Sequence, residues 1–213
     1  DYGATPVYSG NPPTRYMDEQ YRYSFKDWTP ETEAVSKDAV YTAEYNKTER
    51  VFHTVAFDVN GGEGTMDVQR LEVGYETGLT ANAFSRTGYS FTGWNTAADG
   101  SGTAYADQAV LTGLTEDITL YAQWQINTYK VTWMGDNGQI LDEKSLEYGS
   151  PIPKYAGETP TKEENAQYTY TFAGWTPEDV TTVTGDITFT ATFTENLKQY
   201  TITWKDWDGT VLL

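Results

Sequence analysis

The sequence predicts a mainly β protein made of small domains repeated in tandem, with little helix. The chain has 17 Tyr, 7 Trp, 8 Phe and 19 Gly residues and is rich in Thr and Val, a balance that favours strands and turns over helices. Similar segments recur at a period of about 71–76 residues, which suits a small domain better than a solenoid unit. Asn-Gly and Asp-Gly pairs follow alternating segments and indicate hairpins.

Each repeat opens with a strand of alternating apolar and polar residues. The versions read HTVAFDVNGG from His53, YKVTWMGDNG from Tyr129 and YTITWKDWDG from Tyr200. Alternation with a period of two is typical of a strand with one buried face. The turn pairs that follow are Asn60-Gly61, Asn137-Gly138 and Asp208-Gly209. Because both central residues of a tight hairpin turn take positive φ, we expect that backbone conformation at each pair.

A second strand, such as Met66–Val73, leads through a Pro- or Gly-rich segment to a Phe-x-x-Trp strand. Two versions of the Phe-x-x-Trp strand match closely, since Tyr21–Pro30 reads YRYSFKDWTP and Tyr168–Pro177 reads YTYTFAGWTP. A third version, Gly88–Trp94, reads GYSFTGW. Another alternating strand, such as Glu116–Trp124, closes the unit.

These matches divide the chain into four segments. They are 1–51, an incomplete repeat that lacks its opening hairpin; 52–126 and 127–199, two repeats; and 200–213, the opening strand and turn of a further repeat. We therefore expect the chain to be a fragment of a longer protein. In the alternative phase, units of about 71 residues each start near a Tyr-Gly pair, and the next opening hairpin completes the preceding unit.

Helix is expected only as short pieces, because no segment keeps a 3.6-residue period. The two candidate places are Leu79–Phe84 and Lys162–Gln167.

The Trp residues fall into two groups. One Trp position recurs in every copy, as Trp28, Trp94 and Trp175. Because each copy has the same core position to fill, we predict that these residues are core anchors, each largely buried. Stacking on a sugar is the alternative role for them. Trp207 has no aromatic equivalent in the other copies and lies beside a turn. It is the predicted exposed contact residue, although crowding against a neighbouring repeat would also explain it.

The charge and the missing residue types exclude several classes of function. A net charge of −17 repels nucleic acid and anionic membrane surfaces, so neither is expected as a partner. Without cysteine and with one histidine, the chain cannot form disulfides, thiol sites or His clusters. No apolar run approaches the roughly 20 residues that span a bilayer, and no membrane insertion is expected in this fragment.

No motif gathers the residues that catalysis needs. Adjacent carboxylates, such as Glu163-Glu164 and Asp142-Glu143, point to opposite faces of a strand. His53 could act as a catalytic base only beside a nucleophile, and the sequence has no nucleophile-elbow motif. The run Asn60–Gly64 lacks the spacing and the lysine of a phosphate loop, and the Asp- and Asn-containing turns lack the further carboxylates of a calcium loop. The sequence therefore predicts no enzyme, no catalytic residue, no metal ligand and no cofactor.

The middle copy, about residues 52–126, carries the pattern TVAFDVNGGEGT, VGYETGL, RTGYSFTGWNTAADGSGTAY and EDITLYAQW in that order. This pattern resembles the Listeria–Bacteroides repeat of the internalin B-repeat type. The flanking copies resemble a divergent sister form, in which GWTPEDVTTVTGDITFTATF replaces the second half. The resemblance implies small β-grasp-like domains in tandem on extracellular bacterial surface proteins, with stalk, spacer or adhesion roles and no catalysis.

Two functions are consistent with these features. The first is a stalk or spacer on the bacterial cell surface that displays an adhesive domain, and the second is direct adhesion to a host or matrix glycan or protein. The linker Gln125–Thr128 is too short for free rotation, so neighbouring repeats are expected to contact one another and form an extended, semi-rigid rod. Head-to-tail self-association through residues 200–213 is also predicted, because that segment carries the opening pattern that residues 1–51 lack.

Overall fold

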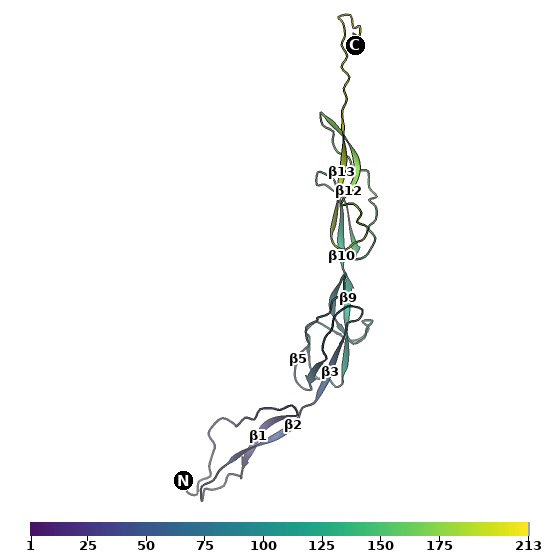
Figure 1. Ribbon diagram of the computed structural model, residues 1–213. Helices are drawn as coiled ribbons and strands as arrows, with labels where there is room; N and C mark the ends of the chain where they lie inside the picture. The colour runs from purple at the N-terminus through teal and green to yellow at the C-terminus, as the bar shows by residue number, and fades with distance from the viewer. Residues whose placement is uncertain (213) are drawn as a thin grey trace. The chain divides into compact units, whose positions relative to one another are not determined.

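The molecule consists of strands and connecting segments. The computed structural model describes residues 1–212, which form the thirteen strands β1 to β13 and no helix (Figure 1). The predicted mainly β fold class is confirmed.

The two short helices proposed near Leu79–Phe84 and Lys162–Gln167 were wrong. In each segment an Asn side chain binds nearby backbone instead of leaving it to a helix. Asn82 Oδ1 accepts a hydrogen bond from the Phe84 amide at 3.0 Å, and Asn165 Oδ1 accepts one from the Gln167 amide at 2.8 Å. Such local side-chain bonds compete with helix formation.

The contacts divide the chain into two compact units. One combines residues 1–84 with 92–123, and the other combines residues 85–91 with the chain from Trp124 onward.

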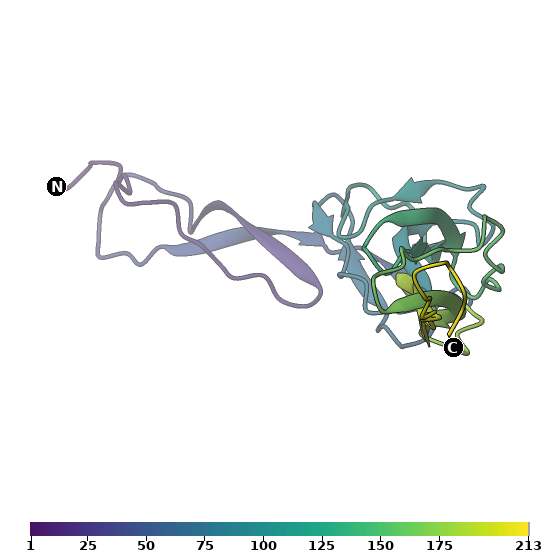
Figure 2. The same ribbon diagram turned by 90° about the horizontal axis from the view of Figure 1, so that it is seen from above.

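The first unit begins with a two-stranded hairpin. β1 (Tyr21–Thr29) pairs antiparallel with β2 (Thr42–Glu49), and a bulge lies between Phe25 and Asp27. Residues 1–20 run beside this hairpin as irregular chain (Figure 2). None of residues 1–51, all of which the structure describes, is buried. A two-stranded hairpin of this kind is marginally stable in water without a further packing partner.

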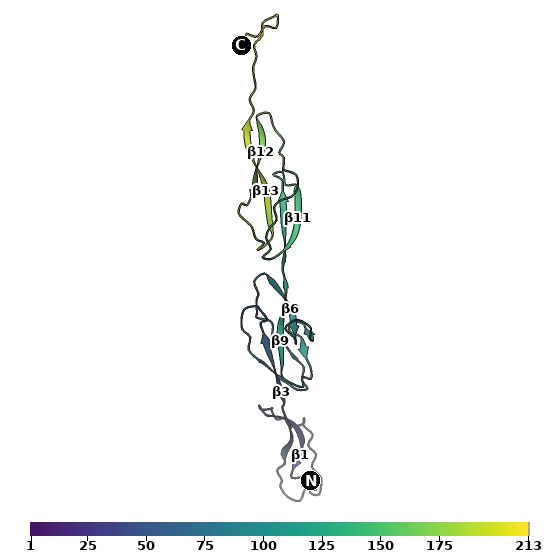
Figure 3. The same cartoon turned by 90° about the vertical axis from the view of Figure 1, so that its right-hand side faces the viewer.

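The middle sheet has the strand order β4-β3-β9-β6-β7. Figure 3 labels three of its strands, β3, β9 and β6. Its strands are β3 (Phe52–Asp58), β4 (Gln69–Glu72), β6 (Tyr89–Asn95), β7 (Ala104–Tyr105) and β9 (Ile118–Ile126), and a separate small ribbon joins β5 (Thr77–Gly78) to β8 (Val110–Leu111). β3 and β9 lie parallel, although they are far apart in the sequence. The side chains of Val55, Trp94 and Leu120 are buried here, because the inward positions of these alternating strands share one face.

The second unit contains a sheet with the order β11-β10-β13-β12. Its strands are β10 (Thr128–Met134), β11 (Ile140–Glu147), β12 (Tyr168–Thr176) and β13 (Ile187–Leu197). β10 and β13 lie parallel, and β12 pairs antiparallel with β13 with a bulge between Phe172 and Gly174. The buried cluster of this sheet is Val131, Trp133, Val183 and Phe189.

The predicted positive φ at both turn residues occurs at one of the three turns. Asn60 and Gly61 have φ of 46° and 82°. In the other two pairs the glycine alone is left-handed, with φ of 85° at Gly138 and 89° at Gly209. At each of these two pairs the strands are joined by a three-residue turn. In the first of them, the Gly135 amide donates a hydrogen bond to Gln139 O at 2.8 Å. A three-residue turn that ends in a left-handed glycine needs positive φ only there.

The chain after β13 extends without joining the sheet. Residues 198–212 leave β13 as an extended segment that ends in a small turn, closed by the isolated bridge between Lys205 and Val211 (Figure 1). Ile202 and Trp204 are 75% and 65% exposed. The alternating apolar positions of this segment therefore have no buried face.

Candidate functional site

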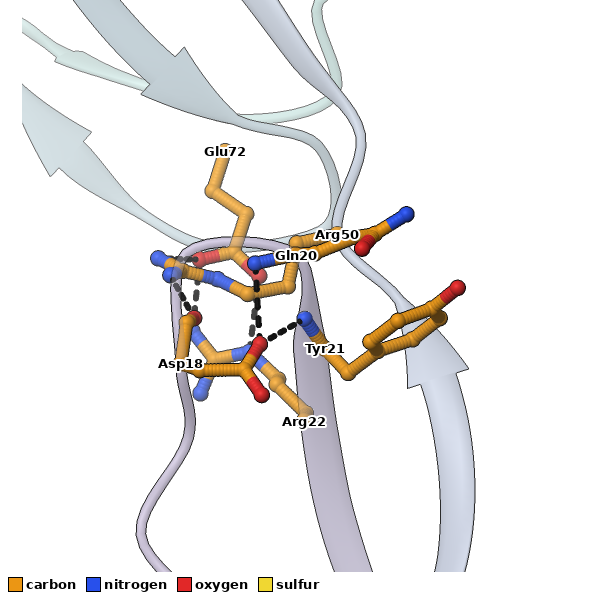
Figure 4. Close-up of polar contacts among 6 residues, drawn as sticks. All are labelled: Asp18, Gln20, Tyr21, Arg22, Arg50 and Glu72. Carbon is orange, nitrogen blue, oxygen red and sulfur yellow. Dashed lines mark hydrogen bonds and ion pairs between the residues drawn. The ribbon is translucent and has the colours of Figure 1, made fainter.

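The first unit contains an ion-pair joint between its hairpin and its sheet. Glu72, the last residue of β4, accepts hydrogen bonds from Arg22 of β1, with Nε to Oε1 and Nη2 to Oε2 both at 2.7 Å. Arg50 follows β2 and donates from Nη2 to Glu72 Oε2 at 2.9 Å. Figure 4 shows both guanidinium groups turned toward this one carboxylate. A bidentate arginine fixes direction as well as distance, so the joint restricts rotation of the hairpin.

Backbone and ring contacts hold the two arginines in place. The Arg50 amide donates to Gln20 O at 2.9 Å, and its Nη1 donates to Asp18 O at 2.7 Å. The Arg22 guanidinium lies 3.7 Å from the centre of the Tyr75 ring. A cation over an aromatic face is attracted to it, so the Tyr75 ring helps to hold the Arg22 guanidinium in place.

The charges of the joint support one another. The Arg22 hydrogen bonds, followed by that of Arg50, lower the pKa of Glu72 to about 2. The same carboxylate raises the pKa of Arg22. Asp18, which caps the chain before β1, has its pKa lowered first by the Tyr23 hydroxyl and then by the Tyr21 amide. The joint is therefore fully charged at neutral pH.

The second unit contains an equivalent joint built from different side chains. Leu146-Glu147-Tyr148-Gly149 follows the pattern of Leu71-Glu72-Val73-Gly74. The Tyr148 amide donates to Asn127 O at 2.8 Å, as the Val73 amide donates to Val51 O at 2.8 Å. These bonds give the two joints the same backbone connection.

The side chains of the second joint are aromatic and small. The ring of Tyr148 lies on Gly88, where a methyl group would overlap it. The amide of Asn127 donates to Gly88 O at 2.9 Å, and its Oδ1 accepts from the Ser90 hydroxyl at 2.6 Å. Glu147, at the position of Glu72, is exposed. Ring packing therefore stands where the first joint has an ion pair.

The three recurring Trp residues lie in unequal surroundings. Trp94 is 1% exposed, between the rings of Phe57 at 4.9 Å and Phe84 at 5.9 Å. Trp28 and Trp175 are half-buried. The three positions, each expected to be largely buried, therefore differ: Trp94 is enclosed because Phe84 covers its ring, whereas Trp28 and Trp175 are half-buried.

Each outer Trp packs on one tyrosine, with ring centres 4.9 Å apart for Trp28 and Tyr8 and 5.0 Å apart for Trp175 and Tyr155. A hollow of about 690 Å³ opens beside Trp175. Phe172, Trp133 and Tyr155 also line this hollow. Trp207, the predicted contact residue, is 93% exposed.

Sequence comparison between repeats does not reveal the ion-pair joint. Arg22 is replaced by Thr169 in the matching strand of the third copy, and by Gly88 in the middle copy. The available signal is a departure from the repeat at one position, where Arg22 stands in place of the small residues Thr169 and Gly88.

The other polar groups considered from the sequence have structural roles. His53 Nδ1 lies 3.5 Å from Asp117, and Asp117 accepts a hydrogen bond from the Thr54 amide at 2.7 Å. Asp186 accepts from the Lys130 amide at 2.8 Å in the same way. Among residues 1–212, no three His, Cys, Asp or Glu side chains gather as a metal site would require. That part of the chain also has no helix with the length and apolarity needed to cross a membrane.

The middle copy matches a known family. Residues 53–123 fit the sequence profile of the Listeria-Bacteroides repeat domain. The middle copy is a Listeria–Bacteroides repeat. The predicted resemblance is therefore confirmed, and the match covers the strands from β3 to most of β9.

Relatives of the chain extend the similarity beyond this repeat. Two proteins of Evansella cellulosilytica, both named as membrane proteins, are 36% identical over 115 residues and 32% identical over 197 residues, which is 54% and 85% of this chain. Internalin H of Listeria monocytogenes is 36% identical over 154 residues, 68% of this chain. The matches span 12%, 26% and 25% of these relatives, respectively.

A structural comparison gives a weaker likeness. Two streptococcal high identity repeats in tandem from a cell surface protein cover 69% of this chain and 99% of their own, with 16% identity and a TM-score of 0.24. The sequence matches relate the chain to a repeat-domain family, to an internalin and to proteins named as membrane proteins.

Proposed function

We propose that the chain is a non-catalytic stalk or spacer in a bacterial cell-surface protein and that it displays an adhesive domain. The observation that supports this most is the directness of the connections between copies. Asn127 alone separates β9 from β10, and Arg50 and Val51 separate β2 from β3. Side chains and backbone bonds on both sides hold each connection, as the two joints show. Short connections held in this way limit the rotation of one repeat relative to the next.

The proposed stalk is an extended, semi-rigid rod of β-grasp-like repeats. In both complete sheets, the opening strand lies parallel to the closing strand, as β3 lies beside β9 and β10 beside β13. This arrangement supports the β-grasp-like interpretation. A net charge of −17 keeps an exposed extracellular protein soluble and separate from its neighbours.

Small-angle scattering tests the stalk. We expect the distance distribution of the chain to have the long tail of an elongated particle. A matched variant with a flexible Gly-Ser insertion after Asn127 keeps both sheets but releases the second joint, and its distribution should broaden. A compact distribution for the unmodified chain, or no difference between the two proteins, would contradict the proposal.

A second function, adhesion to a host or matrix glycan, is favoured by one observation. The hollow of about 690 Å³ beside Trp175 is lined by aromatic rings and by the polar residues Lys154, Glu178 and Thr181. Aromatic faces with a few polar groups around them are typical of small-ligand sites. A glycan array probed with the chain tests this role. A signal that Trp175→Ala abolishes would support adhesion at the hollow, whereas one that Trp207→Ala abolishes would place it at the exposed turn.

A further inference from the structure

We propose that the open edge of β12 binds an extended peptide segment of a partner protein as an added antiparallel strand. The partner segment carries an aromatic residue opposite Trp175 and basic residues at its ends. The inference goes beyond the stalk function, and it rests on a comparison of the three Phe-x-x-Trp strands of this chain, β1, β6 and β12.

The middle copy shows which kind of strand such an edge accepts. β6 lies between β9 on one side and β7 on the other. β7 runs antiparallel to β6, with Tyr105 opposite Trp94. The Tyr105 carbonyl oxygen approaches Gly93 so closely that a methyl group on this glycine would lie 2.8 Å from it. The edge of a Phe-x-x-Trp strand therefore accepts an antiparallel strand directly beside its glycine and its Trp.

In the third copy the same edge is open. β12 is the last strand of its sheet and pairs only with β13 in the part of the chain that the structure describes. Gly174 has the conformation of Gly93, with φ of 136° and 139°, respectively. Apart from its chain neighbours, none of the described residues lies within 4 Å of a methyl group placed on Gly174. The space that β7 fills beside β6 is therefore left free beside β12.

The edge of β12 also lacks the charges that discourage strand pairing. No residue of Tyr168–Thr176 is charged. The equivalent strand β1 carries Arg22, Lys26 and Asp27, and Asp27 stands where β12 has Gly174. β11, at the opposite edge of the β12 sheet, has four charged residues among its eight. Because charges on a free edge disfavour pairing with another chain, the edge of β12 is suited to pairing in a way that those of β1 and β11 are not.

The residues at the two ends of β12 indicate the charge of the partner. Glu163 precedes the strand and Glu178 and Asp179 follow it, and all three are exposed. The lysines Lys162 and Lys198 form ion pairs with acidic residues of this chain, which as a whole has a net charge of −17. Basic residues at the ends of the added strand are therefore attracted, whereas a second copy of β12, with its own acidic flanks, is repelled.

The middle copy also gives the register of the contact. The aromatic partner residue would lie opposite Trp175, as Tyr105 lies opposite Trp94, and the residue before it would be small, like Ala104. Since opposite residues of an antiparallel pair project to the same face, the partner ring would stand beside Trp175 at the hollow that this Trp lines. The antiparallel direction places the preceding basic residues next to the acidic pair that follows β12. Main-chain hydrogen bonds supply affinity, and the aromatic residue supplies register.

Titration of the ¹⁵N-labelled 213-residue chain with the synthetic peptide KKTAYTVTVK, followed by NMR, tests the proposal. The peptide joins Thr103–Tyr105 of the middle copy to an alternating extension, with lysines at both ends. We expect saturable shifts at the amides of Thr169–Trp175. Replacing the peptide tyrosine by alanine should weaken binding by about tenfold, because aromatic anchors dominate such contacts. Replacing its lysines by glutamates should also weaken binding by about tenfold.

Three controls separate strand pairing from binding of the tyrosine side chain alone. Successive residues of a strand direct their N–H groups to opposite sides, so N-methylation of the peptide at odd positions and at even positions blocks opposite edges. One of these two peptides should lose binding and the other should keep it. A chain in which residues 95–108 replace residues 176–180 carries the covering segment of the middle copy beside β12 and should not bind. In the unmodified chain, the amides of β6 are the internal control and should not shift, because β7 already covers their edge.

Several outcomes overturn the proposal. One is a titration without shifts at the amides of β12. Another is equal binding by the two N-methylated peptides with shifts confined to Lys154 and Thr181, which would place the tyrosine in the hollow without strand pairing. Equal binding by the lysine and glutamate peptides contradicts the basic partner. Self-association of the chain through β12, measured by sedimentation velocity, would make a second copy the occupant of the edge.

Discussion

The first and third copies share a hairpin but not a core. Their Phe-x-x-Trp strands are nearly the same in sequence, and their bulges coincide. The third copy buries Val131, Trp133, Val183 and Phe189, whereas residues 1–51 bury no side chain. The recurring Trp does not make a core by itself. The core depends on the opening strand, which comes much earlier in the sequence than the hairpin that it completes.

The two joints share a backbone hydrogen bond but differ in the side chains around it. Both keep the same backbone bond, from Val73 to Val51 in one and from Tyr148 to Asn127 in the other. Around it, one joint uses two arginines and a carboxylate, and the other uses a tyrosine ring on a glycine. The backbone connection therefore sets where the repeats meet, and the side chains set how the contact responds to solvent conditions.

The largest loss of stability is expected when a Trp inside a core is replaced, and the smaller loss at a Trp outside a core serves as the comparison. Trp133→Ala and Trp94→Ala should each lower the free energy of unfolding of their own sheet by about 3–5 kcal/mol, because a large ring leaves a large cavity. Trp28→Ala, at the position equivalent to Trp94, should cost under about 1 kcal/mol, since none of residues 1–51 around its ring is buried and no buried cluster is disrupted. Urea unfolding followed by NMR signals of each sheet measures these changes. Equal losses at Trp28 and Trp94 would remove the distinction between the copies.

An intermediate effect is expected at Trp175. Its ring packs on Tyr155 and Phe172 at 5.0 Å and 5.4 Å but faces the hollow on its other side. Trp175→Ala should therefore cost about 2–3 kcal/mol, less than the loss of a fully buried ring. The same unfolding measurement applies, and Trp207→Ala serves as the exposed control. A loss as large as that of Trp133→Ala would show that the hollow is closed in solution.

Much of this architecture is predictable from local pattern, and the remainder depends on distant contacts. Alternation predicts the strands around Thr54–Phe57 and the Phe-x-x-Trp strands because it repeats over a few neighbouring residues. The parallel neighbours of β3 and β10 are not encoded locally, and the half-burial of Trp28 follows from what lies beside it in space. Glu72 was missed for a third reason, since its bidentate partner Arg22 is a departure from the repeat and self-comparison selects what recurs.

A smaller effect tests the ionic joint. Glu72→Gln keeps the shape of the side chain but removes the charge that both arginines contact. It should cost about 1–2 kcal/mol, between the values for exposed and buried ion pairs. Hydrogen exchange at the Arg50 and Val73 amides should become faster, because these amides lie in the joint. Glu147→Gln is the matched control, since Glu147 has the same place in its joint and is exposed. Equal effects of the two changes would mean that the ion pair adds nothing to the connection.

The smallest effect is the response of the two joints to acid. The pKa of Glu72 is lowered from 4.5 to about 2 by its two arginines. A carboxylate with a lowered folded pKa contributes stability that is complete above its unfolded pKa and is lost as the pH falls toward the folded value. The ionic joint should therefore weaken progressively between pH 4.5 and about pH 2.

Other carboxylates with lowered pKa, Asp18 and Asp117 among them, also respond to acid. The quantity to measure is therefore the difference in amide exchange between the unmodified chain and Glu72→Gln at each pH, which cancels these shared contributions. That difference should be constant from pH 7 to pH 5 and shrink below it, while the aromatic joint, followed at the Tyr148 amide, shows no such difference. A gap that persists undiminished at pH 2 would mean that the charge of Glu72 does not hold the joint.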